Sequence, residues 1–260
     1  MLTHAVELAQ SSWGNRLVAG YALGSLAHGG FSIHVSDVDL GLILGDPLDD
    51  RDAKEVDRLV IGVSGAPPAD RLSVFWGSVA TLSGAATGGR FPPIDLLDLV
   101  RHGRLICGRD VRAQLRTPTW RELVVSGARF ALGRLSTPDV TTHLKHPASL
   151  AHADVKTLTK LVLFPVRLLF TARTGQVGMN DEAVDHFLAV ECGPAAELAR
   201  KSVEWRSTPP EAGDHAVAAL LQQGALPLYR IFINDYERRL REYAERDLAQ
   251  AYREWRQQLA

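Results

Sequence analysis

The sequence predicts an α+β protein, in which a small mixed sheet flanked by helices is followed by an all-helical half. Short apolar runs bounded by turn residues, which indicate β-strands, fall in the first half of the chain. From Thr119 onward every periodic segment has the spacing of a helix. Thr117-Pro118 lies where one pattern gives way to the other, so we expect domains at residues 1–117 and 118–260.

The elements of the first half each have a local signal. Asp49 and Asp50 open a helix because acidic residues in a first turn complement the helix dipole. A Gly-Ala-Pro-Pro break at 65–68 separates this helix from the next strand, and the glycine-rich stretch 84–93 is a long loop. In chain order we expect a helix over 2–13, strands over 17–23 and 38–44, a helix over 49–60, a strand over 71–76, a helix over 94–102 and a short return over 105–108.

The second half is expected to consist of helices alone. We place them near 119–133, 152–174, 180–191, 194–205 and 225–257. The most apolar of them, around 158–170, contains Lys160, Pro165 and Arg167 and is too short to span a bilayer.

Composition narrows the class of protein. The chain has 260 residues, enough for two modest domains, and its 29 Lys and Arg nearly balance its 30 Asp and Glu. This balance argues against nucleic acid as a partner. Cys107 and Cys192 lie far apart and form no metal-binding pair, and residues 1–13 lack the pattern of a signal peptide. We therefore expect a cytoplasmic protein without a membrane partner.

An acid pair in the second strand is the first candidate site. Asp37 and Asp39 are two residues apart, and such residues point to the same face of a strand. Two adjacent carboxylates repel each other unless a cation lies between them, and hard oxygen ligands suit Mg²⁺. We expect both residues to be catalytic metal ligands, and Ser36 beside them to bond only local backbone.

A glycine-serine turn ends the first strand. Gly24 and Ser25 offer backbone N–H groups and a hydroxyl, which suit the phosphates of a nucleoside triphosphate. Together with a metal-binding acid pair, such a turn predicts nucleotidyl transfer.

This arrangement resembles the DNA polymerase β-like nucleotidyltransferase superfamily. Its signature is a Gly-Gly or Gly-Ser turn, a spacer of roughly ten residues and an acid pair within an apolar strand, and Gly24, Ser25, Asp37 and Asp39 fill its positions. The resemblance implies a third carboxylate on the strand after the next helix. The mid-strand position holds Ser73, so we favour Asp70 at the start of that strand over Asp95, and the third alternative is that no third acid exists.

Two later segments look like the aminoglycoside (3'')-type adenylyltransferases. These are Asp95–Gly108, similar to their segment with a His-Gly pair, and Val166–Val184, similar to their helix followed by a Thr-Gly turn. The resemblance implies ATP as donor with Mg²⁺, and an antibiotic hydroxyl as acceptor in a cleft between the nucleotidyltransferase domain and a helical substrate-binding domain. The family's phosphate-binding lysine aligns with Asn180, so we assign phosphate binding to Lys156 and Lys160 on the preceding helix.

Three functions remain open on the sequence. The first is a small-molecule adenylyltransferase. The second is a toxin-type nucleotidyltransferase that modifies a protein or a tRNA. The third is a catalytically degenerate nucleotide-binding protein, which Ser73 and Asn180 favour.

Overall fold

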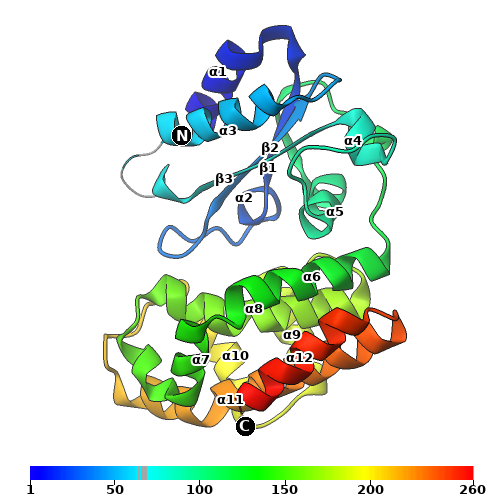
Figure 1. Cartoon of the computed structure of the whole chain (residues 1–260). Helices are drawn as coiled ribbons and strands as arrows, with labels where there is room; N and C mark the ends of the chain where they lie inside the picture. Colours follow the sequence, from blue (N-terminus) through cyan, green and yellow to red (C-terminus); the bar gives the residue numbers. More distant parts are fainter. Residues whose placement is uncertain (64, 66–68, 260) are drawn as a thin grey trace. The chain divides into compact units, whose positions relative to one another are not determined.

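The chain separates into two compact units, Met1–Pro118 and Thr119–Ala260. The computed structural model describes residues 1–63, 65 and 69–259, so the predicted break at 65–68 lies outside the described residues except for Gly65. The first unit holds a mixed sheet with helices and the second is helical, which confirms the predicted fold class (Figure 1). Each unit is described by itself.

The sheet of the first unit has four strands in the order β3-β2-β1-β4. Strand β1 is antiparallel to both β2 and β4, whereas β2 and β3 are parallel. The strands are β1 (Leu17–Leu23), β2 (Val38–Leu44), β3 (Leu72–Ser78) and β4 (Arg104–Gly108). The bounds of β1 and β2 are those predicted, because both strands are apolar runs closed by turn residues.

Helices cover both faces of this sheet (Figure 1). On one face α1 (Leu2–Trp13) and α3 (Asp50–Val63) pack against Leu40 and Leu42 of β2. On the other face Leu96 and Leu99 of α5 (Pro93–His102) pack against Tyr21 and Leu23 of β1. Because successive side chains of a strand point to opposite faces of the sheet, the first unit has one hydrophobic core on each face.

Asp52 ties the elements of the first of these faces together. Its side chain is 2 % exposed and accepts hydrogen bonds from Trp13 Nε1 of α1 at 2.8 Å and from both terminal nitrogens of Arg16. Burial by itself would raise the pKa of Asp52, but the hydrogen bonds from Arg16, the Asp49 amide and Trp13 outweigh it and hold that pKa below its ordinary value. Asp52 therefore links α3 to α1 and to Arg16.

Short elements connect the strands. They are η1 (Gly14–Arg16), α2 (Ser25–His28), η2 (Ala69–Arg71), α4 (Val79–Ser83) and η3 (Arg112–Gln114). The predicted long loop is anchored at its end, because Arg90 and Trp76 exchange backbone hydrogen bonds of 2.7 and 3.0 Å. This bridge covers part of the outer edge of β3.

The second unit contains more helices than predicted. Its elements are α6 (Trp120–Leu135), α7 (Pro138–Lys145), η4 (Pro147–His152), α8 (Val155–Thr174), α9 (Asn180–Val190), α10 (Pro194–Glu204), α11 (His215–Glu242) and α12 (Arg246–Gln258). Helix α7 was not predicted. The single helix expected over 225–257 is wrong, because the chain turns at Ala244, where φ is +59°.

Tertiary packing accounts for this turn. Helix α12 packs on α11, with the rings of Tyr236 and Tyr252 stacked at 5.7 Å and the buried carboxylate of Glu237 paired with Arg253 and Arg256. Residues 243–245 are Tyr, Ala and Glu, so no glycine or proline marks the break in the sequence.

Helix α8 contains Pro165, and α11 compensates for it. A proline has no N–H, so the carbonyl of Leu161 four residues earlier loses its helical partner. The hydroxyl of Tyr229 on α11 donates to that carbonyl at 2.9 Å. Helix α11 is long and apolar enough to cross a membrane, but a core helix of a soluble protein meets the same criterion, and here Leu228 and Phe232 are fully buried.

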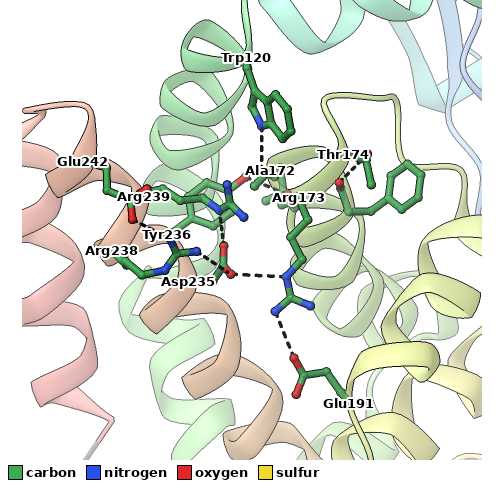
Figure 2. Close-up of polar contacts among 12 residues, drawn as sticks. Trp120, Ala172, Arg173, Thr174, Glu191, Asp235, Tyr236, Arg238, Arg239 and Glu242 are labelled. Carbon is green, nitrogen blue, oxygen red and sulfur yellow. Dashed lines mark hydrogen bonds and ion pairs between the residues drawn. The ribbon is translucent and has the colours of Figure 1, made fainter.

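Figure 2 shows an ion-pair network that joins three helical segments of this unit. Arg173 near the end of α8 contacts Asp235 of α11 at 3.4 Å and Glu191 after α9 at 3.1 Å. Asp235 also accepts from Arg239 one turn later. All four side chains are largely buried, so each charge depends on its partners.

Candidate active site

The acid pair lies at the start of β2. Val38 and Leu40 are buried on the α1–α3 side, so Asp39 between them faces the side on which α5 packs. Asp39 is partly exposed and pairs with Leu23 of β1 and Ser73 of β3. Asp37 is also partly exposed and belongs to the loop before the strand, so that loop determines its placement.

That loop is held by its own hydrogen bonds. The hydroxyl of Ser36 accepts from the Ser32 amide at 2.9 Å, and the Ser36 amide donates to the Ser32 carbonyl at 2.9 Å. Arg71 at the end of η2 donates to the Ile33 carbonyl at 2.7 Å. Ser36 makes the local backbone bonds that the sequence predicts, and Asp37 follows a segment held by such bonds.

The glycine of the turn lies directly beside Asp39. Gly24 follows β1 with φ +58°, and a Cβ on it would lie 2.6 Å from Oδ2 of Asp39. Only glycine combines this backbone conformation with this close approach. Ser25 begins the single turn of α2, whose Ala27 and His28 amides donate to the Gly24 carbonyl. The structure therefore brings Gly24, Ser25 and Asp39 together at one end of the sheet.

Serine occupies the strand position beside the acid pair. Ser73 of β3 pairs in register with Asp39. Asp70 lies in η2, is half exposed, and has an oxygen 3.6 Å from Nε of Arg71. Asp95 lies in the first turn of α5. Among the described residues, no group of three or more His, Cys, Asp or Glu side chains is arranged to hold a metal ion.

The sequence places Asp98 in a helical segment and predicts no role for it. It lies among the leucines of α5, is 5 % exposed, and its Oδ2 accepts the Gly24 amide hydrogen at 2.6 Å. Its Oδ1 lies 3.7 Å from Nε2 of His28, whose ring meets that of His102 edge to face at 5.5 Å. A carboxylate within the apolar run 96–99 was the available signal, because charged residues are almost never buried without a partner.

The donor set fits a divalent cation. Asp37 and Asp39 offer hard oxygens, and Mg²⁺ is commonly held by one or two carboxylates with the remaining positions filled by water and substrate phosphates. The missing Cβ of Gly24 leaves room beside Oδ2 of Asp39. Two protein carboxylates are therefore enough to form the protein part of such a site.

The predicted lysines belong to the second unit. Lys156 and Lys160 both lie on α8, and Nζ of Lys160 is 5.7 Å from the centroid of the Phe164 ring. Met179 is the residue before α9 and Asn180 begins this helix, at the position where the resemblance to the adenylyltransferases predicts a lysine. On the same helix α8, Nε of Arg167 donates to the Gly178 carbonyl at 2.5 Å.

Comparison with known proteins supports the fold. No family model and no curated protein sequence matches the chain. Among solved structures it is similar to spectinomycin adenyltransferase AAD(9) from Enterococcus faecialis, determined with ATP and spectinomycin. The TM-score is 0.61 at 13% sequence identity, over 91% of this chain and 98% of that chain. The predicted resemblance to adenylyltransferases is thus confirmed at the level of the fold.

Proposed function

We propose that this protein is a nucleotidyltransferase that moves AMP from ATP to a hydroxyl group of a small molecule. The observation that carries the proposal is the contact between the Gly24 turn and Asp39, with Asp37 two residues before it. Support for ATP and a small acceptor comes from a protein of the same fold that was solved with ATP and spectinomycin.

Each residue of the turn and the acid pair has a separate task. Asp37 and Asp39 would hold Mg²⁺, which would supply positive charge to the triphosphate and to the leaving pyrophosphate. Gly24 lets the phosphates approach the backbone closely, and the Ser25 hydroxyl donates to a phosphate oxygen. The turn and the acid pair orient the α-phosphorus for in-line attack by the acceptor hydroxyl. Phosphate binding by Lys156 and Lys160 stays a prediction from the sequence.

The proton of the acceptor hydroxyl needs a base. Ser73, which is in register with Asp39, cannot serve, because a neutral hydroxyl is too weak a base. Asp70, Asp95 or a group of the acceptor itself takes this role. The acceptor class we propose is an aminoglycoside-type antibiotic, on the strength of the spectinomycin in the similar structure.

A second candidate is a nucleotide-binding protein with weakened or lost transfer chemistry. The serine at position 73 favours it, since the strand beside the acid pair lacks a carboxylate there. Such a protein binds ATP with Mg²⁺ but transfers no label to any acceptor.

The test measures transfer of label from ATP labelled at the α-phosphate. Spectinomycin and other aminoglycoside-type antibiotics are offered as acceptors, and a protein extract and tRNA are offered in parallel. We expect Mg²⁺-dependent labelling of a small molecule, and a loss of at least about 100-fold in Asp37→Asn and in Asp39→Asn, because each removes a metal ligand.

The matched control is Asp57→Asn. Asp57 is an exposed residue of α3, so this change removes the same charge from the same unit away from the turn. Wild-type rates in either Asp37→Asn or Asp39→Asn would refute the metal assignment. Binding of ATP without transfer to any acceptor would support the second candidate instead.

A further inference from the structure

A single buried carboxylate, that of Asp98, lies next to both ends of the one-turn helix α2. Oδ2 of Asp98 accepts the amide hydrogen of Gly24, the residue before the helix, at 2.6 Å. Oδ1 of the same group lies 3.7 Å from Nε2 of His28, the last residue of the helix. Because an isolated helical turn is unstable in water, α2 depends on contacts of this kind.

The carboxylate of Asp98 is buried against the turn. The side chains of Asp98 and His28 are each 8 % exposed, and the ring of His102 packs edge to face on that of His28. A buried carboxylate is costly unless it is hydrogen-bonded and close to a positive group. The Gly24 amide supplies the hydrogen bond, and the ring of His28 lies next to the other carboxylate oxygen.

Gly24 lies between two carboxylates. Its amide donates to Asp98, and the position of its absent Cβ is 2.6 Å from Oδ2 of Asp39. A shift of Gly24 therefore changes both the start of α2, where Ser25 lies, and the space beside Asp39. It also follows that the Gly24 amide is occupied, so the turn must bind phosphate through other groups, among them Ser25.

We infer that Asp98, together with His28, is a positioning residue that holds the Gly24–Ser25 turn against Asp39 in the geometry that a nucleoside triphosphate requires. This inference rests on the proposed function for the identity of the ligand. The clamp itself rests on the hydrogen bond and the buried contact with His28.

Three variants separate positioning from general stability. Asp98→Leu removes the acceptor and the charge, whereas Asp98→Asn keeps an oxygen that can accept from Gly24. Asp52→Asn is the matched control, because Asp52 is an equally buried aspartate that bonds α1 and η1 on the opposite face of the sheet. Each variant is studied as the full chain at a temperature where circular dichroism shows it folded.

The first measurement is hydrogen exchange of the amides of residues 24–28 without nucleotide. We expect exchange at least about tenfold faster in Asp98→Leu, an intermediate rate in Asp98→Asn and an unchanged rate in Asp52→Asn, since charge-assisted hydrogen bonds are strong. Equal exchange rates in wild type and Asp98→Leu would overturn the clamp.

The second measurement is the dissociation constant of ATP with Mg²⁺ by calorimetry. We expect at least about tenfold weaker binding in Asp98→Leu, partial recovery in Asp98→Asn and wild-type binding in Asp52→Asn. If ATP binding were weakened equally in Asp98→Leu and Asp52→Asn, Asp98 would contribute only to general stability and would not position the turn. If the wild-type protein bound no ATP, the proposed function would be wrong. The hydrogen-exchange rates of residues 24–28 would still decide whether Asp98 holds the turn.

Discussion

Gly24 and Gly14 share nearly the same backbone conformation but differ in their surroundings. Gly14 has φ +50° and ψ −125°, and Gly24 has φ +58° and ψ −146°. A Cβ on Gly14 meets nothing within 4 Å, whereas one on Gly24 meets the Asp39 carboxylate. At the scale of single residues, comparing Gly14 with Gly24 therefore distinguishes the effect of backbone strain from the effect of close contact with Asp39.

Alanine at the two positions should therefore have different effects. Gly14→Ala is expected to lower the free energy of unfolding by about 1 kcal/mol through backbone strain and to leave transfer from ATP unchanged. Gly24→Ala adds displacement of Asp39, so we expect transfer to fall by at least about tenfold beyond any effect of stability. Steady-state rates with the two variants check this. Equal rates would show that the contact with Asp39 is unimportant.

Ser73 allows the question of the third acid to be decided. Paired residues of neighbouring strands point to the same face, so Ser73→Asp places a carboxylate beside Asp39. If the protein has no third acid, transfer should rise by roughly 100-fold, the usual contribution of a general base. Ser83→Asp on α4 is the control for added charge. An unchanged or lower rate in Ser73→Asp would indicate that another residue, such as Asp70, already serves as the base.

At the scale of elements, Asp52 joins α1, η1 and α3. We expect Asp52→Asn to lower the free energy of unfolding by about 2 kcal/mol near neutral pH, because it weakens hydrogen bonds from Trp13 and Arg16 to a buried charge. The pKa of Asp52 is lowered in the folded protein, so its contribution is present above the ordinary carboxyl pKa of about 4 and is lost as pH falls through the folded value.

Urea unfolding between pH 3 and pH 7 measures this contribution. The difference between wild type and Asp52→Asn should be largest at pH 7 and shrink toward pH 3. Asp57→Asn, an exposed change on the same helix α3, should follow the wild-type curve. If the difference in unfolding free energy between wild type and Asp52→Asn stayed constant over the whole pH range, the charge of Asp52 would not be what stabilises the contact between α1, η1 and α3.

At the scale of the whole molecule, the two units have separate cores. The first unit buries both faces of its sheet, and the second buries α8 and α11 against their neighbours. We therefore expect fragments 1–118 and 119–260 to unfold cooperatively on their own, as monitored by circular dichroism on heating.

Fragment 1–92 is the control for this prediction. It lacks α5 and β4, and with them Leu96 and Leu99 of the second core, so it should show no cooperative transition. Non-cooperative unfolding of fragment 1–118 would show that this unit depends on the rest of the chain.

The sequence by itself determined the fold class and the bounds of β1 and β2, and it predicts a site at the ends of these strands. These depend on signals within a few residues, namely apolar runs, a Gly-Ser turn and two acids two residues apart. The proposed roles of Asp37, Asp39 and Ser25 were drawn from the same local pattern. Local periodicity specifies which face of a strand a residue occupies, and so it was sufficient for these elements.

Only the tertiary structure decided which distant residues meet at the site. Asp98 bonds Gly24 across 74 positions of sequence, and Trp13 bonds Asp52 across 39. The break between α11 and α12 likewise depends on contacts such as that of Tyr236 with Tyr252 rather than on a glycine or proline. Such contacts arise because each polar group must find a partner once the apolar faces have packed, and no local pattern specifies which partner lies within reach.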